Sequence, residues 1–171
     1  MKKIYLLFIA ILSFQVFGFA QKTPKFDLTK DGMKPIIVAF DTSYHDSVIY
    51  AKIKEWISLN NKNPQSVTRI DNKNSLVKFS CFAHDGWKSK INNVDYWNEL
   101  QFTFAIEIKD ARCRITFATD ENRYKFWYNA DGKIKDQFKE SETTFENSVN
   151  KQLASLYDFM LHGPKTKKDD W

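Results

Sequence analysis

Hydrophobic and polar residues alternate along three stretches in the middle of the 171-residue chain. The longest spans 99–109, and shorter ones span 75–84 and 112–119. A period of two is typical of strands that bury one face. In 99–109 the apolar positions are Leu100, Phe102, Phe104, Ile106 and Ile108. The pattern predicts an antiparallel sheet with one covered face, and Lys109, Asp110 and Ala111 predict a tight hairpin between its last two strands.

Two other stretches repeat apolar residues at helical spacing. The first predicts a helix over about 44–61 that ends before Pro64, and Ser43 with Asp46 resembles a capping box at its start. The second stretch predicts a helix that ends at Gly163, and Thr143 with Glu146 again resembles a capping box. Its apolar stripe consists of Phe145, Val149, Leu153, Leu156 and Met160.

Three more stretches are candidate strands, and the expected order counts only one of the two weaker ones. The continuous apolar run 36–40 predicts a buried strand, and weaker strands are predicted at 66–70 and 123–128. The sequence therefore predicts an α+β domain, an antiparallel sheet with two helices packed on one face in the order β-α-β-β-β-β-α. We expect a single domain over 35–163, preceded by a polar leader at 21–34 and followed by a flexible charged tail at 164–171.

The first twenty residues have the pattern of a secretory signal peptide. Lys2 and Lys3 precede an apolar run over 4–16, and small residues Gly18 and Ala20 come before a predicted cleavage site at Gln21. The alternative is a membrane anchor, but the run is shorter than the ~20 residues that a span needs. We expect an exported protein of the periplasm or the extracellular space, with no transmembrane segment after cleavage.

Charge and composition narrow the classes of protein further. The chain has a formal charge of +5, but two of its lysines lie in the signal segment, which leaves 24 basic and 21 acidic residues, a net +3 over 151 residues. This ordinary charge, together with export, gives no reason to expect a nucleic-acid partner. A hydrophobic content of 43% excludes a disordered chain, and two cysteines exclude a disulfide scaffold.

Candidate residues for covalent or metal chemistry are few. Cys81 and Cys113 lie on the apolar side of strands that a third strand separates. Next-nearest strands are about 9.5 Å apart, beyond the ~7 Å limit of a disulfide, so we favour buried thiols, with a disulfide as the alternative. His45, His84 and His162 lie at the ends of three different elements. Their spacing matches no metal motif, and no metal or cofactor is expected.

Two surfaces are candidates for binding. The first is segment 85–99, expected to be a long loop whose Trp87, Tyr96 and Trp97 form an aromatic lip. The alternatives are that these rings pack over a sheet edge or that the segment extends the hairpin. The second is the open sheet face, with the basic residues Lys78, Arg112 and Arg114, for which the alternative is a solvated face.

The segments 55–58 (Glu-Trp-Ile-Ser) and 104–115 also carry a resemblance to a known family. Over roughly 36–119 the chain resembles an exported bacterial family catalogued as domain of unknown function 4468, which has a TATA-binding-protein-like fold. The resemblance implies that fold and export. It implies no catalytic residues, and it leads us to expect glycine where this chain has Ala111.

These patterns favour a non-catalytic exported domain. We expect it to bind an unknown envelope protein or a small ligand through the aromatic segment and the open sheet face. The alternative is a small exported enzyme, a hydrolase, whose site is not recognisable in the sequence. Oligomeric state and ligand identity do not follow from the sequence.

Overall fold

A computed structural model describes residues 23–164, apart from Thr42 and Glu121. The expected signal peptide and all of the expected tail except Pro164 lie outside these residues. Five strands form one antiparallel sheet in the spatial order β3-β7-β6-β5-β4. They are β3 (Ile36–Ala39), β4 (Thr68–Asn72), β5 (Leu76–Ile91), β6 (Val94–Lys109) and β7 (Arg112–Ala118).

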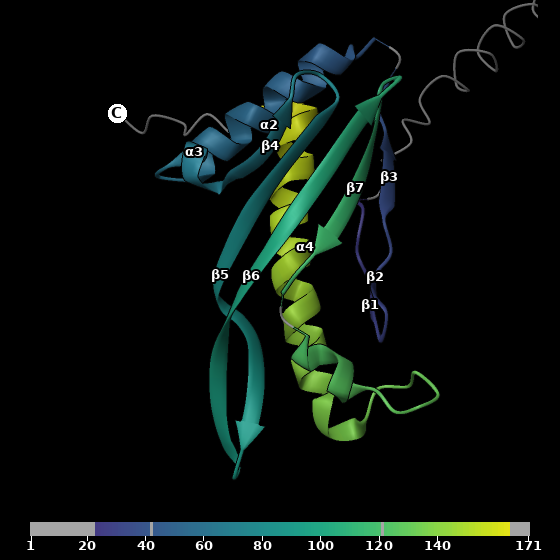
Figure 1. The fold of residues 1–171 in the computed structure, drawn as a ribbon, viewed down its shortest axis with the longest axis vertical. Coiled ribbons are helices and arrows are strands. Elements are labelled where there is room, and N and C mark those ends of the chain that lie inside the picture. The colour runs from purple at the N-terminus through teal and green to yellow at the C-terminus, as the bar shows by residue number, and fades with distance from the viewer. Residues whose placement is uncertain (1–22, 42, 121, 165–171) are drawn as a thin grey trace, which may run out of the picture.

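Two long helices cover one face of the sheet. Helix α2 (Asp46–Asn60) packs near the C-terminal end of α4 (Lys139–His162), and Figure 1 shows α4 running along the sheet. The core lies between helices and sheet. Every member of the predicted stripe on α4 is buried there, as are Phe79 and Phe104 on the sheet. The predicted α+β class and the order β-α-β-β-β-β-α are confirmed. In the described part of the chain, no helix is long and apolar enough to cross a membrane.

The β6–β7 hairpin has the predicted tight turn. Asp110 and Ala111 have φ angles of 52° and 56°, which is the positive-φ pair of a type I′ turn. This turn matches the right-handed twist of the two strands, so β6 and β7 pair without a break from Lys109 opposite Arg112 to Thr103 opposite Ala118.

Both predicted capping boxes are wrong. Helix α2 begins at Asp46 after His45, which makes no side-chain cap, and Asp46 bonds to the β6–β7 turn instead. Helix α4 begins at Lys139, so Thr143 lies inside it and donates to the carbonyl of Lys139 at 2.9 Å. Phe138, just before α4, lies against Trp127, and this tertiary contact accompanies the earlier start.

Segment 85–99 is not a loop. β5 and β6 continue through it to a turn at Asn92 and Asn93, both with positive φ, so the alternative of an extended hairpin is correct. The pairing shifts between Ala83 and Trp87, where β5 has extra residues relative to β6. This bulge bends and twists the strands, and Figure 1 shows the hairpin extending well past the end of β7.

Two other strand predictions need correction. β3 was expected to be buried, but it is an edge strand, and Ile37 is 72% exposed because it points away from the helices. Residues 123–128 do not form a strand, because 123–127 form the 3-10 helix η2 (Arg123–Trp127). Tyr124 and Trp127 are three residues apart and both buried, which suits a helix with three residues per turn. A second 3-10 helix, η3 (Asp136–Phe138), leads into α4.

The segment expected to be a polar leader packs onto the domain from residue 26. Strands β1 (Leu28–Thr29) and β2 (Gly32–Met33) form a small antiparallel pair. The side chain of Asn150 on α4 bonds both the N–H (2.7 Å) and the C=O (2.8 Å) of Phe26, whose ring stacks on Phe104 at 6.0 Å. The fold therefore begins before Pro35, the expected domain boundary. The remaining short helix, α3 (Pro64–Val67), precedes β4.

Candidate functional site

Three hollows of the surface contain residues singled out from the sequence. One lies at the start of α2, one lies between the hairpin tip and η2, and one lies on the open sheet face. The three hollows differ in how many of their polar side chains already have hydrogen-bond partners within the protein. A side chain without such a partner is available to a ligand.

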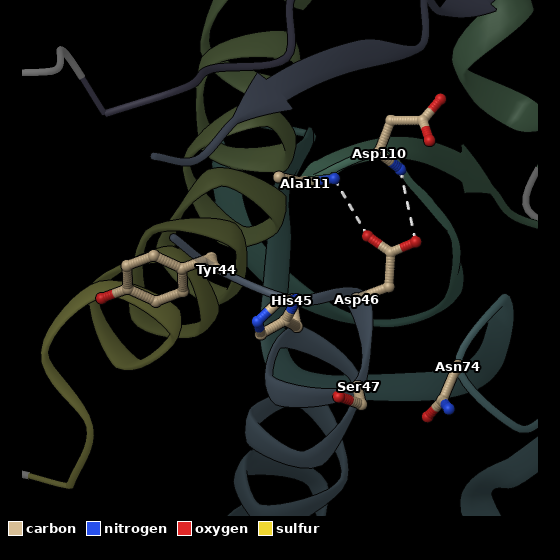
Figure 2. A pocket seen from close by; sticks show the side chains of 7 residues that line it. All are labelled: Tyr44, His45, Asp46, Ser47, Asn74, Asp110 and Ala111. Atoms are coloured by element: carbon tan, nitrogen blue, oxygen red, sulfur yellow. Dashed lines mark hydrogen bonds between the residues drawn. The ribbon is translucent and has the colours of Figure 1, made fainter. Parts of the chain in front are cut away.

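Figure 2 shows the hollow at the start of α2, which holds His45 and Asp46. One carboxylate oxygen of Asp46 accepts a hydrogen bond from the backbone N–H of Ala111 at 2.9 Å. The other oxygen accepts one from the backbone N–H of Asp110 at 3.3 Å. Both oxygens are thus engaged by the turn. The His45–Asp46 dipeptide therefore supports structure, and this hollow of about 650 Å³ offers little chemistry.

The remaining histidines and the cysteines lie apart from one another. His84 Nδ1 is 3.3 Å from Glu99 and His162 Nδ1 is 3.0 Å from Asp158, both on the surface. Cys81 and Cys113 are buried free thiols with β6 between their strands, as predicted. Burial raises the pKa of each thiol to about 12, so neither supplies a thiolate nucleophile at neutral pH. The described residues contain no cluster of three metal-ligating side chains.

The second hollow, called the hairpin pocket here, has a volume of about 720 Å³. It lies between the tip of the β5–β6 hairpin, η2, η3 and the first turn of α4. Aromatic and aliphatic side chains form much of its wall, namely Trp87, Ile91, Phe126, Trp127 and Phe138. Phe126 is 73% exposed and Ile91 is 58% exposed, so the pocket opens beside an apolar rim.

The rings of the hairpin pocket pack against one another in a short row. The centroids of Trp87 and Trp127 are 5.1 Å apart, and Phe138 stacks on Trp127 at 6.3 Å. The guanidinium of Arg123 lies over the ring of Trp87 at 5.5 Å. Trp87 is only 5% exposed, and its indole N–H has no hydrogen-bond acceptor among the described residues. An unpaired buried donor of this kind is rare and costs about 1–3 kcal/mol.

Polar residues on α4 support the extension of the hairpin. Glu140, Thr144 and Ser148 are spaced four residues apart and so share one face of the helix. Glu140 accepts from Lys88 Nζ at 2.6 Å, Thr144 accepts from the Lys88 backbone N–H at 2.9 Å, and Ser148 donates to the carbonyl of Asp85 at 3.2 Å. β5 is therefore attached along α4 beyond the bulge, which fixes one wall of the hairpin pocket.

Of the three predicted aromatic residues, only Trp87 lines the hairpin pocket. Tyr96 and Trp97 are on β6, where they pair with Ser89 and Lys88 of β5. Their side chains are 47% and 55% exposed. The sequence did not identify Arg123, Trp127 or Phe138 as neighbours of Trp87. The aromatic residues at 124–128 indicate a buried segment, but the pattern predicts a strand there and so does not place them beside Trp87.

The three predicted basic residues lie on two strands, β5 and β7, with β6 between them. Lys78 lines the third hollow, on the open sheet face. Arg112 and Arg114 are exposed on β7, and Arg114 is 3.7 Å from the carboxylate of Glu107 on the same face. The structure therefore does not join the basic residues of this face into one cluster.

Comparison with known proteins bears on the fold. Residues 39–121, from the end of β3 to just past β7, match the model of a family described as a domain of unknown function (DUF4468) with a TBP-like fold. Neither the curated proteins nor the solved structures gave a match. The family model that matches residues 39–121 is thus the one that the sequence resembles, and the TBP-like fold in its description agrees with the observed α+β sheet.

Proposed function

We propose that this protein is a non-catalytic, exported binding module whose hairpin pocket takes a compact apolar ligand bearing an acidic group. The pocket volume of about 720 Å³ is within the range of ~300–1,000 Å³ that is typical of small-molecule sites. Aromatic rings form much of its wall, and a few polar groups lie at its rim, which is the usual composition of such sites.

The observation that carries the proposal is the row of Trp87, Trp127 and Phe138 with the unpaired indole N–H of Trp87. The unpaired indole N–H of Trp87 lowers the stability of the folded protein, and so does the exposed ring of Phe126. Here both features lie at the same hollow, where a ligand could pair with the donor and cover the apolar rim, and this coincidence supports a binding site.

Charges around the hairpin pocket favour an acidic group on the ligand. Arg123 and Lys90 line it, and it reaches Ser141 in the first turn of α4. The backbone N–H groups of that turn carry a partial positive charge. Glu140 of the same turn is 2.6 Å from Lys88, which offsets part of its negative charge.

Export and the absence of catalysis are part of the proposal. Export is supported by the signal-peptide pattern of residues 1–20. Its direct test is whether the intact mass of the secreted protein matches a chain that begins at Gln21. A non-catalytic role is supported by the buried thiols of Cys81 and Cys113 and by the surface positions of the histidines.

The pocket can be tested with anilinonaphthalene sulfonate, an aromatic acid whose fluorescence rises in apolar sites. We expect the native protein to bind it and Phe126→Ser to weaken binding about fivefold, because one apolar contact of ~1 kcal/mol is lost. Ile37→Ser is the matched control, since Ile37 is as exposed as Phe126 but lies on the edge strand β3.

Near-ultraviolet circular dichroism of each variant must match that of the wild type, which excludes dye binding to a loosened core. Equal binding by Phe126→Ser and Ile37→Ser, or no binding by the folded wild type, would overturn the proposal.

A further inference from the structure

A row of small side chains crosses the open face of the sheet. Ser80 on β5 pairs with Thr103 on β6, and Thr103 pairs with Ala118 on β7. Their neighbours along the strands include the longer Lys78 and Gln101. The small residues therefore leave a hollow of about 410 Å³, called the sheet-face groove here, which runs across the strands.

Opposite charges line the two ends of the sheet-face groove. Arg69 on β4 and Lys78 on β5 line one end, and the Nε–H of Arg69 donates to the buried hydroxyl of Ser80 at 3.2 Å. Asp120, just after β7, lines the other end. Within the described residues, no ion pair joins any of these three to another charged side chain, whereas Arg114 and Glu107 on the same face lie 3.7 Å apart.

The spacing of the strands sets the length of ligand that can span the two ends. β4 and β7 are three strand intervals apart, roughly 14 Å. The side chains reach inward from both ends, and an extended peptide rises ~3.3 Å per residue, so about two to four residues fit between them. Between the ends, Ser80, Thr103 and Gln101 offer hydrogen-bonding groups.

We infer that the sheet-face groove binds a short peptide with free ends, its carboxylate at Arg69 and Lys78 and its amino group at Asp120. A guanidinium pairs well with a carboxylate, and an ammonium group pairs with an aspartate. A polyanion such as a nucleic acid is disfavoured because Asp120 would repel it. This site is separate from the hairpin pocket and does not depend on the proposed function.

Trialanine is a suitable probe, with binding followed by NMR chemical shifts of the backbone amides of Ser80 and Thr103. We expect acetylation of its amino group or amidation of its carboxylate to weaken binding about fivefold or more, because each removes one charge pair. Amidation should have a smaller effect on Arg69→Gln than on the wild type, because only Lys78 still pairs with the carboxylate, and acetylation should have no further effect on Asp120→Asn.

Arg114→Gln and Glu107→Gln are matched controls, since they remove charges from the same face outside the groove. Both should bind trialanine as the wild type does, and so should Phe126→Ser of the hairpin pocket. The inference is overturned if trialanine does not bind at millimolar concentration, if capping its ends has no effect, or if Arg114→Gln weakens binding as much as Arg69→Gln.

Discussion

The carboxylate of Asp46 accepts a hydrogen bond at 2.9 Å from the backbone N–H of Ala111, 65 residues further along the chain. Its second oxygen accepts from the N–H of Asp110 at 3.3 Å (Figure 2). The first residue of α2 thereby holds the turn between β6 and β7. One side chain thus fixes the end of a helix against the end of the sheet that the helix covers.

Asp46→Ala should lower the free energy of unfolding by about 1–3 kcal/mol, because two N–H groups of the turn lose a charged acceptor. Asp46→Asn should lose less, since its amide oxygen still accepts one bond. Urea denaturation measures both. Ser47→Ala, an exposed change in the same helical turn, is the control, and an equal effect of Asp46→Ala and Ser47→Ala would contradict the role of Asp46.

Ala111→Gly should raise the free energy of unfolding by about 1 kcal/mol. Ala111 has a φ of 56°, a left-handed conformation that costs L-residues roughly 1–2 kcal/mol and costs glycine almost nothing. Ala105→Gly, in the middle of β6, should instead lower it by about 0.5–1 kcal/mol. Urea denaturation of the two variants gives the sign of each change in the free energy of unfolding. A decrease in both variants would show that the turn is not strained.

Gly86→Ala should lower the free energy of unfolding by more than about 2 kcal/mol. A Cβ atom at Gly86 would lie 2.2 Å from the Cβ of Leu100 and 2.7 Å from its backbone nitrogen, and β6 would have to move away. Gly132→Ala is the control for added bulk, because a Cβ there meets no atom within 4 Å; its φ of 75°, unlike that of Gly86, is left-handed and by itself costs about 1–2 kcal/mol. Thermal unfolding should therefore separate the two variants, and similar midpoints would argue against close packing at the bulge.

The interaction of α2 with β4 should weaken in acid. Asp71 accepts hydrogen bonds from Lys54 Nζ at 2.6 Å and from the Tyr50 hydroxyl at 2.7 Å. Both bonds hold the pKa of Asp71 below its usual value, and the bond from Lys54 has the larger effect. Because the folded pKa is the lower one, this stability is present above the unfolded pKa of ~4 and is lost as the pH falls through the folded pKa.

Asp71→Asn should therefore destabilise the protein at neutral pH and have little effect in strong acid. We expect less than about 1 kcal/mol, since the side chains of Lys54 and Asp71 are 33% and 34% exposed and water screens the pair. Urea denaturation across the pH range measures the difference, with the exposed Asp131→Asn as reference. A difference between Asp71→Asn and the wild type that does not change with pH would contradict the assignment.

Cys81 and Cys113 should resist alkylation by iodoacetamide in the native protein at mildly alkaline pH. Burial raises the pKa of both thiols to about 12, so the reactive thiolate is scarce and shielded. Both should react once urea unfolds the chain, which intact mass detects as two added groups. A native mass lighter by two hydrogens would instead reveal a disulfide.

The sequence by itself determined the fold class and the part of the core that lies on the alternating strands and the helical stripes. The alternation that includes Phe104 and the helical stripe that includes Leu153 each report which side of one element is buried, and that depends on local periodicity alone. The position of the tight turn at Asp110 and Ala111 was predictable for the same reason, because it follows from where the two alternating stretches end, whereas its type I′ geometry came from the structure.

Only the tertiary structure decided which residues share a site. Segment 85–99 lacks clean alternation, and its strands continue because Glu140, Thr144 and Ser148 on α4 support them. The ring contact between Trp87 and Trp127 and the groove from Arg69 to Asp120 join residues of separate elements. Such contacts depend on the register of strands and the docking of helices, which no local pattern of side chains records.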